Sequence, residues 1–211
     1  QLGGFAIKNA VEKAGINPEE IDDVIMGCAM QQGTTGGNIA RLAALSGGLP
    51  YSVSGMSIDR QCSSGMMAIA TAAKQIIVDG MNTVIGGGLE SISLVQNKTM
   101  NTNRMIDEEL VKKHKSIYMP MLQTAEVVSE RYNISREKQD EYALQSQMKT
   151  AAAQESGKFQ NEIVPTTTEM AVYNKETGET SYEIITLDKD QGNRPTTSID
   201  GLNSLKPVIE N

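Results

Sequence analysis

The sequence has few of the residues that cross-link a chain or hold a metal ion. It contains only two cysteines, Cys28 and Cys62, and one histidine, His114. Two cysteines do not make a disulfide framework, and no group of His and Cys residues has the spacing of a zinc site, so we expect neither a structural bridge nor a metal centre. A signal peptide and a long apolar span are also lacking. We therefore expect a cytoplasmic protein with no membrane partner.

Positive charge is scarce as well. The 211 residues include 19 lysines and arginines against 26 acidic residues, which gives a formal net charge of −7. Such a chain has no broad basic field, and this argues against nucleic acid as a partner, although a local cationic pocket could still hold one phosphate. Hydrophobic residues make up 39% of the chain. That content suffices for one sizeable core, or for a core with a smaller lobe.

The first part of the chain alternates between strand-like and helix-like patterns. After a helical segment at 6–14, the expected elements are a strand at 22–30, a helix at 38–46, a strand at 53–58, a helix at 62–78 and a strand at 83–85. This order predicts right-handed βαβ units around a mostly parallel sheet, which is an α/β fold. The helix that follows Gln61 carries only Lys74 and Asp79 as charged residues before Gly80. We therefore expect it to be buried on more than one side.

The character of the sequence changes after Ser91. Charge density rises, and the alternation of strands and helices gives way to a polar stretch. Ordinary capping and turn signals then predict helices at 124–132 and 136–156 and a small hairpin around 176–178. We predict two domains, an α/β core at 1–91 and an α+β lobe at 92–211.

Cys62 is the residue best placed for chemistry. It stands between a strand-like run and an apolar helix, where the first backbone N–H groups have no intrahelical partner and carry the positive end of the helix dipole. These groups favour a thiolate and can hold a developing oxyanion, so the position suits a covalent nucleophile. The alternative is structural, because a free cysteine commonly serves as a small buried hydrophobe.

Several separated segments together match one family. In chain order they are Gly37-Asn38-Ile39-Ala40-Arg41, Asp59-Arg60-Gln61-Cys62-Ser63-Ser64-Gly65, Gly86-Gly87-Gly88-Leu89-Glu90-Ser91-Ile92-Ser93, Thr124-Ala125-Glu126, Ser135-Arg136-Glu137-Lys138-Gln139-Asp140, Glu162-Ile163-Val164-Pro165, and Arg194-Pro195-Thr196-Thr197 running to Leu205-Lys206-Pro207. Through them the chain resembles the N-terminal part of the thiolase family over nearly its whole length. A lone Cys-Ser-Ser-Gly also occurs in ketosynthases, whereas the ordered set is far more specific.

The resemblance implies a fold and a reaction. The implied fold is a thiolase-like N-terminal half, with a layered αβα core and a loop domain that covers coenzyme A; we expect it to be truncated at both ends, without the first strand and the C-terminal half. Cys62 matches the cysteine that cleaves 3-ketoacyl-CoA, holds the acyl group as a thioester and passes it to CoA, or in reverse condenses two acetyl-CoA molecules. CoA is then a substrate, and no cofactor is expected. Thiolases are homodimers or homotetramers, so self-association is implied too.

Two CoA-binding residues follow from the resemblance. Arg194 matches the arginine that packs against the adenine end of CoA, and Met121 matches a methionine that lines the pantetheine and acyl pocket. Each has a plainer alternative, since Arg194 before a proline could be a solvated loop residue and Met121 could fill core. Pro120-Met121 resembles the degradative branch of the family.

Thiolases also use a histidine, an asparagine and a second cysteine from the C-terminal half, and these have no counterpart in the 211 residues. We therefore expect the isolated chain to lack normal turnover. His114 lies among lysines and is expected at the solvated surface. For Cys28, core packing and a chemical role stay open. For Glu90, the resemblance favours support of the site by hydrogen bonds over direct acid–base chemistry.

The glycine runs at 33–37 and 86–88 form neither a dinucleotide-binding nor a Walker pattern, so we expect them to serve close backbone packing.

Two functions stay open beside thiolase. One is a ketoacyl-carrier-protein synthase of the same fold, and the other is a non-catalytic CoA-binding or assembly fragment.

Overall fold

The computed structural model describes residues 1–209, which form two compact units that divide between Met105 and Ile106. This division lies later in the chain than the boundary predicted after residue 91. Helix α4 (Ile92–Val95) accounts for the difference, because its Val95 is only 3% exposed and the helix packs on the turn η2 (Gly33–Thr35) of the first unit.

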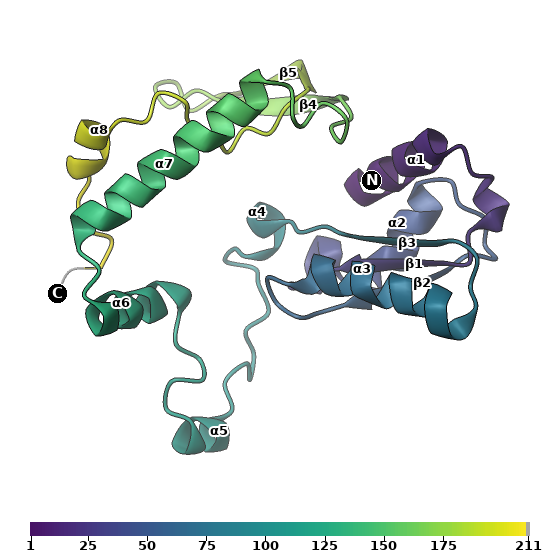
Figure 1. The fold of residues 1–211 in the computed structure, drawn as a ribbon, viewed down its shortest axis with the longest axis horizontal. Helices are drawn as coiled ribbons and strands as arrows, with labels where there is room; N and C mark the ends of the chain where they lie inside the picture. The colour runs from purple at the N-terminus through teal and green to yellow at the C-terminus, as the bar shows by residue number, and fades with distance from the viewer. Residues whose placement is uncertain (210–211) are drawn as a thin grey trace. The chain divides into compact units, whose positions relative to one another are not determined.

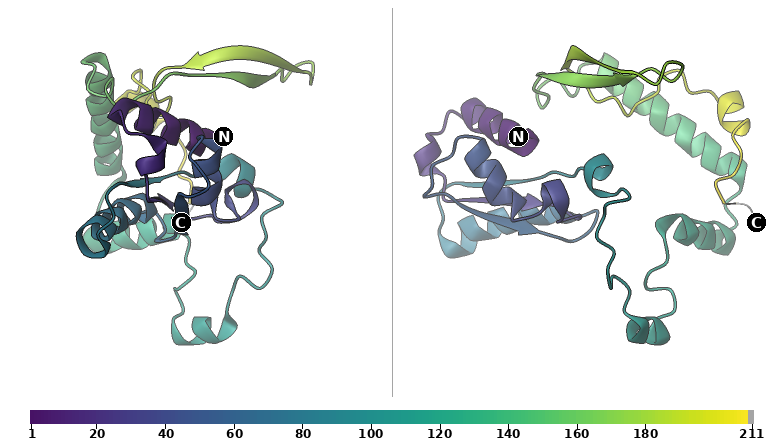
Figure 2. Two further views of the ribbon diagram at one scale, coloured as in Figure 1. Left: turned by 90° about the vertical axis from the view of Figure 1, so that its right-hand side faces the viewer. Right: turned by 180° about the vertical axis from the view of Figure 1, so that it is seen from behind.

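A three-stranded parallel sheet forms the centre of the first unit, with the strand order β2-β1-β3 (Figure 1). The strands are β1 (Asp23–Gly27), β2 (Ser54–Ile58) and β3 (Val84–Gly88). Helices α1 (Leu2–Ala14) and α2 (Ile39–Ser46) cover one face, and α3 (Ser64–Lys74) covers the other, as the two views of Figure 2 also show. This architecture confirms the predicted α/β fold with a mostly parallel sheet.

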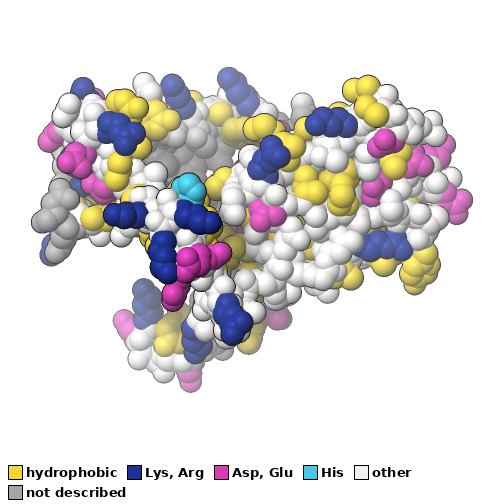
Figure 3. All heavy atoms as spheres, turned by 90° about the horizontal axis from the view of Figure 1, so that it is seen from below, with side chains coloured by type: hydrophobic (Ala, Val, Ile, Leu, Met, Phe, Trp, Pro, Cys, Tyr) yellow, Lys and Arg dark blue, Asp and Glu magenta, His cyan; other side chains and the backbone are white. Residues whose placement is uncertain are grey.

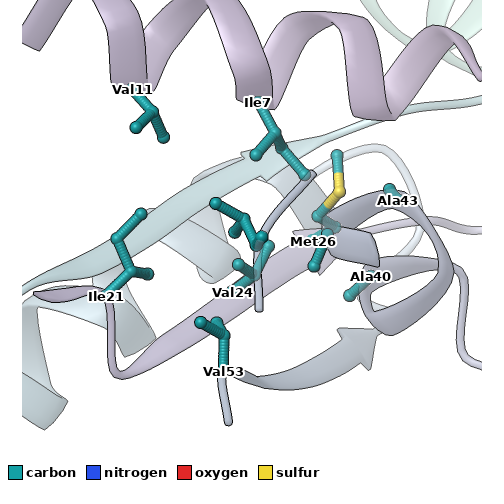
Figure 4. Packing of buried hydrophobic residues seen from close by; sticks show 10 residues of the cluster. Ile7, Val11, Ile21, Val24, Met26, Ala40, Ala43 and Val53 are labelled. Atoms are coloured by element: carbon teal, nitrogen blue, oxygen red, sulfur yellow. The ribbon is translucent and has the colours of Figure 1, made fainter. Parts of the chain in front are cut away.

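The middle strand, β1, is buried along its whole length, and its side chains alternate between the two faces. Val24 and Met26 point toward α1 and α2 and join the apolar cluster of Figure 4. Ile25 points the other way and packs against Ala68 and Ala72 of α3. The strand therefore organises both layers of the core.

Helix α3 buries only one face in the first unit. Its buried residues are Ser64, Ala68 and Ala72, spaced four apart, whereas Met66 is 71% and Ile69 60% exposed. The prediction that this helix is buried on more than one side is therefore wrong for this unit: the small residues face the sheet, and the larger apolar ones face away from it. Figure 3 shows hydrophobic side chains, in yellow, at the surface.

Short turns complete the first unit. They are the 3-10 turns η1 (Pro18–Glu20) and η2, and the π-helical turn η3 (Gln75–Asp79), which ends at Gly80 in the left-handed conformation. No helix within residues 1–209 is long and apolar enough to cross a membrane.

The second unit combines helices with one hairpin. Its elements are α5 (Glu108–Lys113), α6 (Met121–Tyr132), α7 (Arg136–Glu155), β4 (Thr166–Tyr173), β5 (Thr180–Leu187) and α8 (Ile199–Asn203). The strands pair antiparallel, which confirms the expected hairpin. The hydroxyl of Ser135 caps α7 by accepting a hydrogen bond from the N–H of Lys138.

The side chain of Arg136 ties α7 to α8. The guanidinium Nε of Arg136 lies 2.8 Å from a carboxylate oxygen of Asp140, which is only 7% exposed. The same guanidinium donates to the carbonyl of Leu202 in α8 and to that of Leu205, which follows the helix. Because one side chain serves both helices, this contact fixes their packing.

Candidate active site

Cys62 lies in the short loop that joins β2 to α3, two residues before the helix begins, and its side chain is exposed. The first helical hydrogen bond runs from the N–H of Met67 to the carbonyl of Ser63 at 3.0 Å. The N–H groups of Gly65 and Met66 therefore precede the regular bonding of the helix, at its positive end. The structure thus places the thiol where the sequence predicted it, and it does not bury Cys62 as a core residue.

Side chains of the loop itself fix its backbone. The carboxylate of Asp59 accepts a hydrogen bond from the N–H of Gln61 at 2.7 Å. The hydroxyl of Ser64 accepts from the N–H of Arg60 at 2.8 Å and donates to the carbonyl of Gln61 at 2.6 Å. The hydroxyl of Ser63 donates to the carbonyl of Arg60 at 2.9 Å. Side chains that precede Cys62 and side chains that follow it therefore both fix the loop that carries it.

Glycines let the nucleophile loop approach the sheet. A Cβ added to Gly27, at the end of β1, would lie 2.2 Å from the carbonyl carbon of Ser64, so the two backbones touch directly. The same holds in β3. A Cβ added to Gly86 would lie 2.9 Å from the Cα of Ile69, and a Cβ added to Gly88 would lie 2.9 Å from the carbonyl oxygen of Gly27. These contacts confirm the expected backbone packing for Gly86 and Gly88. Gly87 has open space around it.

An open cavity of about 680 Å³ lies at the carboxyl ends of β1 and β3, beside Cys62. We call it the Cys62 cleft. Its walls come from the ends of the two strands, the nucleophile loop and α4, through residues 27–30, 61, 62, 64, 65, 88–90, 92 and 96. Carboxyl ends of parallel strands are the usual place for a site in an α/β fold.

The second cysteine behaves differently. Cys28 is 1% exposed, and its Sγ lies 3.6 Å from a carboxylate oxygen of Glu90. Burial is the largest effect on the Cys28 thiol and raises its pKa; the contact with Thr35 lowers the pKa in part, and the negative charge of Glu90 raises it again. Cys28 is therefore a protonated core residue, and Cys62 is the thiol that a reagent can reach.

A family model described as the N-terminal domain of thiolase matches residues 1–211. The chain belongs to the thiolase family. It is 36% identical over 208 residues to the 3-ketoacyl-CoA thiolase of Bacillus subtilis (strain 168), an alignment that covers 99% of this chain and 52% of that protein.

Other thiolase relatives agree. The probable acetyl-CoA acyltransferase of Staphylococcus aureus (strain COL) is 35% identical over 219 residues, which cover 99% of this chain and 53% of the relative. The peroxisomal 3-ketoacyl-CoA thiolase 1 of Arabidopsis thaliana is 35% identical over 210 residues, which cover 100% of this chain and 46% of the relative. The chain thus spans about half the length of the curated thiolases it matches.

The resemblance favoured a supporting role by hydrogen bonds for Glu90 in this thiolase chain, and the structure identifies its partners. One carboxylate oxygen of Glu90 accepts from the N–H of Ala29 at 2.8 Å and from that of Met30 at 3.3 Å. The other oxygen faces the thiol of Cys28. Glu90 therefore holds the wall of the Cys62 cleft across about sixty residues of chain, and only the three-dimensional fold reveals this pairing.

The two residues predicted to contact CoA belong to the second unit. Met121 begins α6 and is 72% exposed, so it does not fill the core of that unit. Arg194 lies in an exposed loop, and its backbone N–H donates to the side chain of Gln147 at 2.7 Å. Their contact with CoA stays a prediction. His114 is exposed, and Figure 3 draws the histidine side chain in cyan at the surface.

Proposed function

We propose that the protein carrying this chain is an acyl-CoA C-acyltransferase of the thiolase type and that Cys62 carries the acyl group. The observation that carries the proposal is the contrast between the two thiols: Cys62 is exposed on the cleft at the start of α3, whereas Cys28 is buried. The relatives named 3-ketoacyl-CoA thiolase and acetyl-CoA acyltransferase support the reaction class. They also favour thiolase over a ketoacyl synthase.

The proposed cycle has two acyl transfers. The sulfur of Cys62 forms a bond to the C3 carbonyl carbon of a 3-ketoacyl-CoA, and the C2–C3 bond then breaks; its electron pair stays on C2, which takes a proton and leaves as acetyl-CoA. The thiol of free CoA next attacks the Cys62 thioester, and the bond between Cys62 and the acyl carbon breaks as the thiol is restored. The reverse sequence joins two acetyl-CoA molecules. CoA is a substrate throughout, and the cycle uses no further cofactor.

Each tetrahedral intermediate carries an oxyanion that needs hydrogen-bond donors. The N–H of Cys62 is the donor that we assign within this chain. A proton acceptor for the thiol is a separate requirement: no histidine is among the described residues that line the cleft, and both carboxylate oxygens of Glu90 already face donors. We infer that the 211-residue chain by itself does not sustain turnover.

The substrate and partner assignments rest on the same family match. We propose that Arg194 and Met121 contact CoA, that the protein forms a homodimer or homotetramer, and that it works in the cytoplasm. The bacterial relatives fit that location, while one Arabidopsis relative is named as peroxisomal.

The test is the intact mass of the native protein before and after acetoacetyl-CoA, with peptide mapping of the product. We expect the mass of one acetyl group on Cys62 and none on a Cys62→Ala variant. A native protein that takes no acyl group contradicts the proposal.

The 211-residue polypeptide, prepared separately, should show no thiolysis of acetoacetyl-CoA; ordinary rates from it would refute the inferred dependence on further residues. CoA binding without any acyl transfer by the native protein would favour a non-catalytic CoA-binding role.

A further inference from the structure

Gln61, the residue just before the nucleophile, has an unusual backbone. Its φ is +49°, in the left-handed region, which L-residues with a Cβ rarely adopt. The other non-glycine residues with positive φ in residues 1–209 are Asn38, Asn133 and Arg104. Asparagine tolerates this region because its short side chain bonds locally, whereas glutamine has no such advantage. The conformation of Gln61 must therefore be imposed by its surroundings.

Both peptide groups of Gln61 are held by hydrogen bonds to Asp59 and Ser64. Its N–H donates to Asp59, and its carbonyl accepts from the Ser64 hydroxyl at 2.6 Å and from the Ser64 N–H at 3.1 Å. Ser64 is itself only 5% exposed, and its backbone rests on Gly27 of β1. The left-handed turn is thereby anchored to the central strand of the sheet.

The anchor determines where the Cys62 N–H points. The peptide between Gln61 and Cys62 is planar and trans, so its carbonyl and its N–H point in opposite directions. Because Ser64 holds the carbonyl, the N–H of Cys62 is directed away from Ser64. We propose that Asp59 and Ser64 are positioning residues that, through the left-handed backbone of Gln61, orient the Cys62 N–H for the acyl oxyanion. This proposal rests on the proposed acyl transfer to Cys62.

The test compares two reactions of the native protein at the same sulfur. Acetyl transfer from acetyl-CoA needs an oxyanion donor, whereas alkylation by iodoacetamide does not. The readout is the ratio of the acetylation rate to the alkylation rate at Cys62, measured by peptide mass spectrometry. Labelling of the buried Cys28 in the same sample reports loss of the fold, which a change in positioning alone would not cause.

The first pair of variants is Ser64→Ala against Ser63→Ala. Both remove a hydroxyl from the loop, but only Ser64 contacts the Gln61 carbonyl. We expect the ratio in S64A to fall about tenfold or more below that in S63A, with Cys28 still unlabelled. Equal ratios in the two variants would overturn the proposal.

The second pair is Gln61→Ala against Gln61→Gly. Both remove the side chain, but glycine adopts a positive φ freely and alanine does not. We expect the ratio in Q61A to be about fivefold or more below that in Q61G. Equal ratios, whether both high or both low, would overturn the role of the backbone. Gln61 is exposed, so this pair is less prone to disturb the fold. If S64A unfolds enough to expose Cys28, the comparison of Q61A with Q61G tests the positioning proposal instead.

Failure of the proposed function is distinguishable from failure of the positioning proposal. If the unaltered protein is alkylated at Cys62 but takes no acetyl group, acyl transfer is refuted. Because alkylation needs no oxyanion donor, the positioning proposal then falls with it. If the unaltered protein is acetylated and the paired variants give equal ratios, the positioning proposal alone is overturned.

Discussion

Gly27 and Ser64 touch backbone to backbone, at the point where the central strand ends and the nucleophile helix begins. A single methyl group on Gly27 would lie 2.2 Å from the carbonyl carbon of Ser64 and 2.4 Å from the nitrogen of Gly65. This contact couples the position of Cys62 to the sheet, because Ser64 also holds the loop that carries the thiol. The relationship leads to a direct test of how the fold sets the site.

Gly27→Ala should force α3 away from β1 or distort the strand. We expect it to lower the free energy of unfolding by about 2 kcal/mol, at the level of other overpacked cores, and to slow acylation of Cys62. Gly87→Ala is the matched control in β3, since nothing lies within 4 Å of its added Cβ. That variant should stay within about 0.5 kcal/mol of the unaltered protein in urea denaturation. Equal losses in the two variants would contradict the assigned contact.

Much of the first unit could be predicted from sequence periodicity alone. The alternation of strands and helices and the placement of Cys62 between β2 and α3 are local properties of the chain, so composition and spacing reveal them. The exposed side of α3 was not foreseeable in the same way. Apolar residues such as Met66 and Ile69 indicate that a helix can be buried, but not how many neighbours cover it.

The position of the nucleophile was predictable from the sequence, and so was a supporting role for Glu90, but the partners of Glu90 were not. A thiol before an apolar helix is a local pattern, whereas the bonds from Glu90 to Ala29 and Met30 join segments that only the fold brings together. The left-handed backbone of Gln61 was hidden for another reason. A positive φ is usually marked by glycine or asparagine, and glutamine gives no such signal.

Glu90→Ala should free the wall of the Cys62 cleft. Loss of the carboxylate leaves the N–H groups of Ala29 and Met30 without their acceptor, and we expect a loss of about 1 kcal/mol in stability because Glu90 is solvent-exposed. Hydrogen exchange gives the sharper measurement. The Ala29 and Met30 amides should exchange faster in the variant, while the Cys28 amide, bonded to the Ile58 carbonyl at 3.0 Å, keeps its protection. Unchanged exchange at both residues would show that Glu90 does not hold the wall.

Cys28 should make stability depend on alkaline pH. Its thiol pKa is raised above the ordinary value of 9.0, first by burial and then by Glu90, so the folded state binds this proton more tightly than the unfolded state. The resulting stabilisation is fully present below the unfolded-state pKa and is lost as the pH rises through the folded-state pKa.

The measurement is the free energy of unfolding against pH, from neutral to alkaline, for the unaltered protein and Cys28→Ala. Tyrosines and lysines titrate in both proteins, so the difference between the two curves isolates the thiol. We expect the unaltered protein to lose stability more steeply than C28A above about pH 8.5. Parallel curves would mean that the fold does not perturb the thiol.

The contact between Arg136 and Asp140 should be the main ionic contribution in the second unit. Asp140→Ala removes the carboxylate but leaves the guanidinium bonded to the carbonyls of Leu202 and Leu205, so the loss is smaller than for a fully buried pair. We expect about 2 kcal/mol, together with weaker docking of α8. Glu109→Ala is the control. Glu109 forms an ion pair with Lys112, but its side chain is 75% exposed, so this pair should contribute less than about 1 kcal/mol. Urea denaturation followed by limited proteolysis near residue 200 distinguishes the outcomes: similar losses in the two variants, or an uncleaved α8 in D140A, would show that the contact does not fix the two helices.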